Sequence, residues 1–157
     1  MKIKVLFVCL GNICRSPMAE GLMISKIKAK GIDHIEVDSA GTSNYHIGEM
    51  PDNRMMETAA HNGIILGSKA RQFSRVDFEE FDYIIAMDKS NKSDILKMAR
   101  NDEERQKVHL MRDFDDKSAE SDVPDPYFGG QKGFADVFDI LERCSENLLN
   151  SILENRT

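Results

Sequence analysis

Residues 3–17 restrict the possible folds of this chain more than any other part of its sequence. The run Val5–Leu10 is continuously apolar, which is typical of a central parallel strand that is covered on both faces. A short loop follows, after which Ser16 is suited to be the N-cap of a helix and Pro17 its first helical residue. Apolar residues then recur at helical spacing as far as Gly31. The segment therefore predicts a strand, a loop and a helix in direct succession.

Strands and helices alternate in the rest of the chain. Further short strands are predicted at Ile35–Asp38, Tyr83–Met87 and Val108–Met111. Helical patterns cover Pro51–Gly63, Ser90–Arg100 and Phe134–Ile152, and an acidic loop covers Asp113–Gly130. This alternation predicts an open parallel sheet with helices on both faces, in which ligands bind beyond the carboxyl ends of the strands. The positions at such ends are Cys9, Ser39, Asp88 and the loop after Met111.

The composition excludes several classes of protein. With 157 residues, the chain has the size of a single domain, residues 1–157, that folds without metals or disulfides. Its net charge of -6 gives no field that would draw it to nucleic acid or to a membrane surface. The first apolar run is too short for a signal peptide or a membrane span, and three cysteines are too few for a secreted disulfide framework. We therefore expect a cytoplasmic protein that is monomeric or weakly self-associating.

The loop between the first strand and its helix has the composition of an anion site. Backbone N–H groups at a helix N-terminus cradle an anion, and the helix dipole adds positive potential there. Arg15 adds a planar guanidinium that can hold two phosphate oxygens at once. The same positive potential stabilises the thiolate form of Cys9, which makes this residue a nucleophile at neutral pH.

Three motifs in the chain resemble those of one enzyme family. The run V-C-L-G-N-I-C-R-S-P contains Cys9 and Arg15, F-D-Y-I-I-A-M-D follows in mid-chain, and D-P-Y-F-G-G contains Asp125. In this order and spacing they resemble the low molecular weight protein tyrosine phosphatases over essentially the full chain. The expected fold is a three-layer α/β/α domain, with an open four-stranded parallel sheet in the flavodoxin-like order 2-1-3-4 and flanking helices.

The resemblance implies a role for each motif. Cys9 attacks the phosphorus of a phosphotyrosine monoester and forms a phosphocysteine, while Arg15 and the loop amides bind the phosphate. Asp125 is the general acid and then the general base. The implied phosphate-binding loop comprises Leu10, Gly11, Asn12, Ile13, Cys14, Arg15 and Ser16. The implied substrates are phosphotyrosyl proteins or peptides, inorganic phosphate is the product, and no metal or other cofactor is needed.

Supporting roles are implied for residues around this loop, which are Asn12, Ser16, Ser39 and Asp88. Ser16 is expected to donate a hydrogen bond to the Cys9 sulfur, and Asn12 and Ser39 are expected to share a network that fixes the loop backbone. Where the family usually has a histidine in that network this chain has Ser68, which predicts a weaker network. Asp88, at a strand end, either helps to orient the loop or Arg15 or is a solvated cap of that strand end.

Apolar and aromatic side chains are expected to wall a cleft for the substrate ring. They are Leu10, Ile13, Tyr45, Tyr127 and Phe128. Cys14 has two open roles: a small buried apolar residue, or a redox partner that traps an oxidised Cys9 as a reversible disulfide. The four histidines show no metal-ligand spacing and are expected to be structural or surface residues.

Four alternative functions are weaker. An arsenate reductase on the same fold would need further cysteines between residues 69 and 104, where the chain has none. A phosphoarginine phosphatase is an alternative on the same fold, although this chain has Ile13 where such members tend to have threonine. A binding module would not require Asp125 between two prolines, and two neighbouring cysteines provide too few ligands for a structural zinc.

Overall fold

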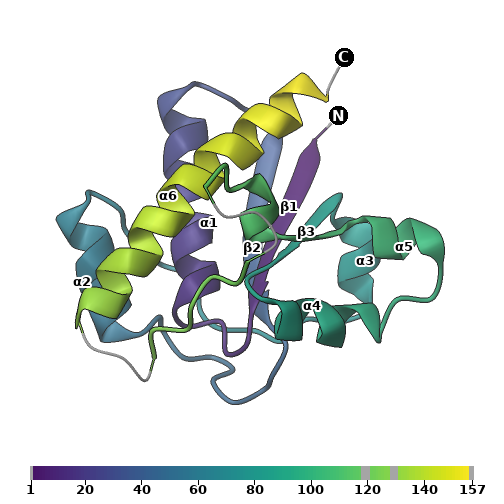
Figure 1. Ribbon diagram of the computed structural model, residues 1–157, viewed down its shortest axis with the longest axis horizontal. Helices are drawn as coiled ribbons and strands as arrows, with labels where there is room; N and C mark the ends of the chain where they lie inside the picture. Colours follow the sequence, from purple (N-terminus) through teal and green to yellow (C-terminus); the bar gives the residue numbers. More distant parts are fainter. Residues whose placement is uncertain (1, 118–120, 128–130, 156–157) are drawn as a thin grey trace.

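The computed structural model describes residues 2–117, 121–127 and 131–155, which form a parallel sheet between two layers of helices (Figure 1). Its strands are β1 (Ile3–Cys9), β2 (Ile35–Gly41), β3 (Tyr83–Ala86) and β4 (Val108–Leu110). Their order in the sheet is β2-β1-β3-β4, and all three pairings are parallel. The predicted fold class and the predicted strand order are therefore confirmed.

Helices cover both faces of the sheet (Figure 1). One face carries α1 (Arg15–Ala29), α2 (Asn53–His61) and α6 (Gln131–Glu154). The other carries α3 (Val76–Glu80), α4 (Lys89–Leu96) and α5 (Asp102–Gln106), and a 3-10 helix, η1 (Met111–Phe114), follows β4. Alternate residues of β1 enter different cores: Val5 and Phe7 pack on the α1 and α6 side, and Leu6 and Val8 on the α3 and α4 side. This two-sided burial explains the continuous apolar run.

Several predicted helix boundaries were wrong. Ser16 is not an N-cap, because α1 already begins at Arg15, with Cys14 in the cap position and no side-chain cap bond. The second helix begins at Asn53 after an Asp52 cap rather than at Pro51, and the helix predicted at residues 90–100 covers Lys89–Leu96. The five-residue helices α3 and α5 were not predicted, since one turn and a half gives too little apolar periodicity to detect.

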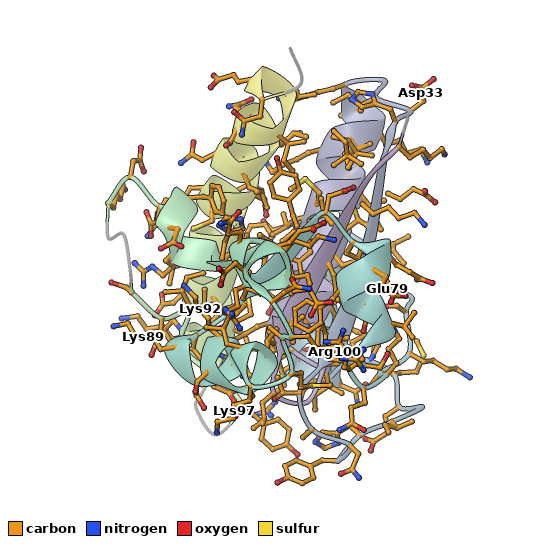
Figure 2. All side chains as sticks on the ribbon, turned by 90° about the vertical axis from the view of Figure 1, so that its right-hand side faces the viewer. Asp33, Glu79, Lys89, Lys92, Lys97 and Arg100 are labelled. Atoms are coloured by element: carbon orange, nitrogen blue, oxygen red, sulfur yellow. The ribbon has the colours of Figure 1, made fainter. Side chains whose placement is uncertain are left out.

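The surface of the α3 and α4 layer is charged. Figure 2 shows this side of the molecule, on which Glu79, Lys89, Lys97 and Arg100 are exposed. In the described ranges, no helix is both long enough and apolar enough to cross a bilayer.

The topology brings two strand ends to one place. Cys9 is the last residue of β1, and its neighbour β3 ends at Ala86, two residues before Asp88. On the other side, Gly41 at the end of β2 pairs with Cys9. A Cβ atom on Gly41 would lie 2.7 Å from the Leu10 carbonyl oxygen, so only glycine lets β2 pass this close beneath the loop that follows β1.

Candidate active site

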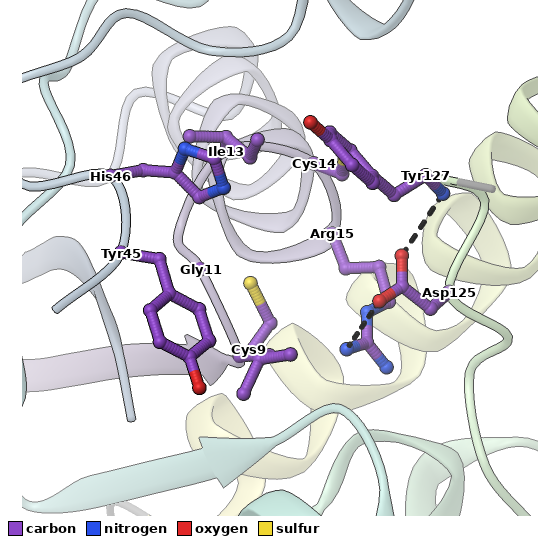
Figure 3. A pocket seen from close by; sticks show the side chains of 10 residues that line it. Cys9, Gly11, Ile13, Cys14, Arg15, Tyr45, His46, Asp125 and Tyr127 are labelled. Carbon is purple, nitrogen blue, oxygen red and sulfur yellow. Dashed lines mark hydrogen bonds and ion pairs between the residues drawn. The ribbon is translucent and has the colours of Figure 1, made fainter. Parts of the chain in front are cut away.

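A pocket of about 140 Å³ opens at the carboxyl ends of β1 and β3 (Figure 3). It is lined by Cys9, Leu10, Gly11, Ile13, Cys14, Arg15, Tyr45, His46, Asp125 and Tyr127. Residues far apart in the sequence thus meet there, because the loop after β1, the loop after β2 and the segment before α6 converge on one edge of the sheet. The phosphate-binding loop predicted at residues 10–16 forms one side of the pocket.

The Cys9 sulfur lies among hydrogen-bond donors at the base of the pocket. Its Sγ atom is 3.0 Å from Ser16 Oγ and accepts a hydrogen bond from the Asn12 backbone N–H at 3.3 Å. Ser16 Oγ accepts from Asn12 Nδ2 at 2.7 Å, so its own hydrogen is left to point to Cys9 or, over 3.4 Å, to the Ala40 carbonyl. The shorter contact favours the sulfur, and both donors stabilise a negative charge on it.

Asn12 fixes the shape of the loop. Its φ of 58° lies in the left-handed region, which asparagine tolerates better than most residues with a Cβ atom. The buried side chain donates to Ser39 Oγ at 3.0 Å as well as to Ser16, and its Oδ1 accepts from the Arg71 backbone N–H at 3.0 Å. Asn12 therefore joins the loop to β2 and to the segment before α3.

The network behind Asn12 continues to a buried carboxylate. Ser39 donates to Glu20 Oε1 at 2.6 Å, and Ser68 donates to the same oxygen at 2.9 Å. Ser68, at which the sequence predicted a weaker network, thus takes part in the network through Glu20. Burial raises the pKa of Glu20, and the two serine hydrogen bonds oppose that rise. Sequence analysis missed Glu20, although its position one helical turn after Ser16 was a usable signal.

Arg15 projects into the pocket from the first turn of α1. Its Nη1 donates to Asp88 Oδ2 at 2.7 Å and to the Val123 carbonyl at 3.0 Å. In these contacts Nη1 faces away from the pocket, which leaves Nε and Nη2 as the natural pair for two phosphate oxygens. Burial alone would lower the pKa of Arg15, but the Cys9 sulfur and Asp88 outweigh burial and raise it.

Asp88 contacts Arg15, as one of its two predicted roles requires, and it also caps a helix. One carboxylate oxygen accepts from Arg15, and the other accepts from the Asn91 backbone N–H at 2.7 Å, which makes Asp88 the N-cap of α4. The orientation of Arg15 is therefore tied to the start of a helix on the opposite face of the sheet.

Asp125 approaches the pocket from the segment of residues 123–127, which we call the acid segment. Its Oδ2 lies 3.7 Å from Arg15 Nη2, and its Oδ1 accepts from the Tyr127 backbone N–H at 3.0 Å (Figure 3). The side chain of Asp125 is 35% exposed, whereas that of Arg15 is 3% exposed. Val123 anchors the start of the segment, since its N–H donates to the Met87 carbonyl at 2.8 Å.

Four of the five predicted cleft residues line the pocket, namely Leu10, Ile13, Tyr45 and Tyr127. Phe128 lies outside the described residues. His46 also lines the pocket, although the sequence suggested a structural or surface role for it. The centroid of its ring lies 6.0 Å from that of Tyr127. The imidazole also lies close to Gly11, where a Cβ atom would be 2.9 Å from it, so a larger residue at this position would displace His46. The sequence signal that could have identified His46 as a pocket residue is its position next to Tyr45, which was a predicted cleft residue.

The second cysteine of the loop is buried. Cys14 is a free thiol, as is Cys9, and both line the pocket. Burial, followed by the charges of Asp52 and Cys9, raises the pKa of Cys14 above its ordinary range. Cys14 is therefore protonated at neutral pH. In the described ranges, no three histidine, cysteine, aspartate or glutamate side chains gather as metal ligands.

Together, the fold and the pocket define an α/β protein of the flavodoxin-like class that can hold an oxyanion against a cysteine at a helix N-terminus. Residues 4–157 match the family described as "Low molecular weight phosphotyrosine protein phosphatase". The chain belongs to this family, whose members hydrolyse phosphomonoesters, and the resemblance seen in the motifs is confirmed.

Individual relatives agree over nearly the full chain. A low molecular weight phosphotyrosine protein phosphatase of Schizosaccharomyces pombe is 43% identical over 152 residues, which cover 96% of this chain and 97% of the relative. The crystal structure of a protein tyrosine phosphatase of Entamoeba histolytica, with Hepes in its active site, has a TM-score of 0.94 and 42% identity and covers 99% of this chain and 100% of that one. A Drosophila arginine phosphatase has a TM-score of 0.89 and 33% identity, with 96% and 98% covered.

Proposed function

We propose that this chain hydrolyses phosphotyrosine monoesters in proteins or peptides, with Cys9 as nucleophile, Arg15 as phosphate ligand and Asp125 as general acid and base. The observation that carries the proposal is the meeting of all three in one pocket, with the Cys9 sulfur already bonded by two donors. These contacts stabilise the thiolate that the proposed attack on phosphorus requires, and they fix the position of the sulfur within the loop.

In the first step, the Cys9 thiolate attacks phosphorus and an S–P bond forms while the bond from phosphorus to the tyrosine oxygen breaks. The loop amides and Arg15 hold the equatorial oxygens, whose charge they stabilise in the transition state. The leaving phenolate, with a parent pKa of about 10, takes the proton of the Asp125 carboxyl group. Tyrosine then departs as the neutral phenol.

In the second step, the Asp125 carboxylate removes a proton from a water molecule whose oxygen attacks the phosphocysteine. The S–P bond breaks, inorganic phosphate is released and the Cys9 thiolate is restored. The Ser16 hydroxyl, 3.0 Å from the sulfur, stabilises the thiolate as it leaves. Asp125 is thereby protonated again for the next cycle.

The depth of the pocket supports a long substrate. Cys9 is only 3% exposed, whereas Leu10 and Tyr45 near the mouth are 40% and 72% exposed. A phosphotyrosine can place its ring between these side chains while its phosphate reaches Cys9. A phosphoserine would have to bring its backbone into the pocket, where its peptide groups would lose their hydrogen bonds to water.

Phosphoarginine is the rival substrate, because the chain is also similar to an arginine phosphatase. The wall residue Ile13 is 8% exposed and offers no hydrogen-bond acceptor. Guanidinium N–H groups against this side chain would lose partners that a phenyl ring does not need. This difference favours phosphotyrosine.

A substrate panel tests the proposal. The purified protein is assayed in a chelator with peptides of one sequence that carry phosphotyrosine, phosphoarginine or phosphoserine. We expect kcat/KM for phosphotyrosine to exceed both others by at least about 10²-fold, the size of effect that unpaired buried polar groups produce. Equal or greater turnover of phosphoarginine would overturn the substrate assignment.

The same proposal covers the surroundings in which the chain works. We propose one catalytic domain, residues 1–157, that acts in the cytoplasm as a monomer or a weakly associating species. The net charge of -6 disfavours nucleic acid and anionic membrane surfaces as partners. Its three free cysteines suit a reducing compartment. Cys14 is buried, and we propose it as a candidate redox partner of Cys9.

A further inference from the structure

The acid segment needs a support on the side away from Arg15. Val123 is buried and anchored, but Asp125 and Tyr127 beyond it are 35% and 36% exposed. On this outer side, Arg54 of α2 reaches the segment and donates from Nη2 to the Tyr127 carbonyl at 3.0 Å. Its guanidinium carbon also lies 5.6 Å from the centroid of the Tyr127 ring.

Arg54 is itself held in place. Asp52, the N-cap of α2, accepts from Arg54 Nε at 3.2 Å and from its Nη2 at 3.0 Å. The guanidinium lies 4.6 Å from the centroid of the Phe134 ring in α6. The Asp52 backbone N–H donates to the Ile13 carbonyl at 2.8 Å. A short path therefore runs from the phosphate-binding loop through Asp52 and Arg54 to the acid segment.

We propose that Arg54 is a positioning residue for the general acid: it fixes the acid segment against the phosphate-binding loop so that Asp125 reaches the leaving oxygen. This inference rests on the proposed function. A general acid works only within hydrogen-bond distance of the atom it protonates, and a displacement of about 1 Å costs about 10²-fold in rate. Arg54 does not need to touch the substrate for this effect.

The test compares kcat/KM for phenyl phosphate, whose leaving group needs a proton, with kcat/KM for 2,4-dinitrophenyl phosphate, whose leaving group does not. In Arg54→Met we expect the first to fall about 10- to 100-fold and the second by less than about threefold. Arg54→Lys, which keeps the charge and one donor, should recover part of the loss. In Asp125→Asn, adding Arg54→Met should cost nothing further, because the proton donor is already absent.

Arg75→Met is a matched control. Arg75 also pairs with a carboxylate (Glu104), donates to a carbonyl (Met98) and stacks on a phenyl ring (Phe78), but it lies away from the pocket. Arg75→Met should leave the ratio of kcat/KM for the two substrates unchanged. Thermal melts test whether each variant is folded at the assay temperature. Asp52→Asn, which keeps the helix cap but loses the charge, is a second variant, for which we expect a smaller loss of kcat/KM on phenyl phosphate.

The outcomes separate the two proposals. If Asp125→Asn lowers the phenyl phosphate rate selectively and folded Arg54→Met does not, the role of Arg54 is wrong and the proposed function stands. Equal losses on both substrates in Arg54→Met, or full additivity with Asp125→Asn, would also overturn it. If Asp125→Asn itself leaves the ratio unchanged, the proposed general acid is wrong, and the inference about Arg54 is wrong with it.

Discussion

The phosphate-binding loop and the acid segment face each other across one pocket, but they are held in different ways. In the loop, Asn12, Arg15 and Ser16 are at most 2% exposed. Asn12 donates to Ser16 and to Ser39 of β2, and Arg15 donates to Asp88 and to the Val123 carbonyl. In the acid segment, Asp125 is supported mainly by the Tyr127 N–H and by Arg15 at 3.7 Å. The nucleophile is thus fixed by the core, whereas the proton donor is presented from the surface.

This difference predicts two kinds of defect. A substitution in the loop should lower kcat/KM equally for every substrate, because the phosphate group of every substrate must be bound and attacked. A substitution in the acid segment should lower kcat/KM only for substrates whose leaving group needs a proton.

The largest effect is expected for Cys9→Ser. A serine hydroxyl is not ionised at neutral pH and cannot replace the thiolate, so kcat should fall by at least about 10⁴-fold on every aryl phosphate. Steady-state assays measure this loss, and calorimetry with inorganic phosphate should show that the anion still binds. Residual turnover near the wild-type level would mean that another group attacks phosphorus.

Arg15→Lys should have the next largest effect. Lysine keeps the charge but cannot hold two oxygens with one planar fork, so kcat/KM should fall about 10²- to 10³-fold. The loss should be equal for phenyl and 2,4-dinitrophenyl phosphate. A loss confined to phenyl phosphate would show that Arg15 acts through Asp125 and not on the phosphate.

Asp125→Asn should have a selective effect. With the proton donor removed, kcat/KM for phenyl phosphate should fall about 10²-fold, and that for 2,4-dinitrophenyl phosphate by much less. A series of phenols of different acidity measures this as a steeper dependence of rate on leaving-group pKa. A uniform loss across the series would place Asp125 in phosphate binding instead.

Much of this contrast could be predicted from the sequence. The phosphate-binding loop is contiguous, so its thiol, arginine and helix start are visible in eight neighbouring residues, and strand alternation gave the sheet. Arg54 could not be assigned, because its contact with the acid segment arises only when α2 packs beside that segment. His46 and Glu20 had local signals, but their contacts with Tyr127 and Ser39 join segments that are distant in the sequence. The N-cap prediction for Ser16 was wrong for a related reason: its hydroxyl faces the Cys9 sulfur.

The smallest effect on activity is expected at Asp115, which directly follows η1. Its fully buried carboxylate accepts from Arg143 of α6 and from Arg112, and so fixes the chain before the acid segment. Asp115→Asn should leave kcat/KM within about threefold but lower the free energy of unfolding by about 3 kcal/mol, because two arginines lose their charge partner. Denaturant titration measures this change.

The pH dependence of that stability has a definite sign. Hydrogen bonding from Arg143 holds the pKa of Asp115 well below its usual range. A group with a lowered pKa in the folded state stabilises the fold fully above its unfolded pKa of about 3.9 and loses this contribution as pH falls below it. Wild type and Asp115→Asn should therefore converge in stability in acid. A constant difference down to pH 2 would contradict this assignment.

Trapping of the covalent intermediate tests the central claim most directly. The wild-type enzyme is mixed with a phosphotyrosyl peptide, quenched during turnover, digested under conditions that preserve a thiophosphate ester, and mapped by mass spectrometry. The account predicts one added phosphoryl group on the sulfur of Cys9, and no S-linked phosphoryl group in Cys9→Ser. A phosphoryl group on another residue, or turnover with no phosphorylated enzyme under conditions that preserve a thiophosphate standard, would contradict it.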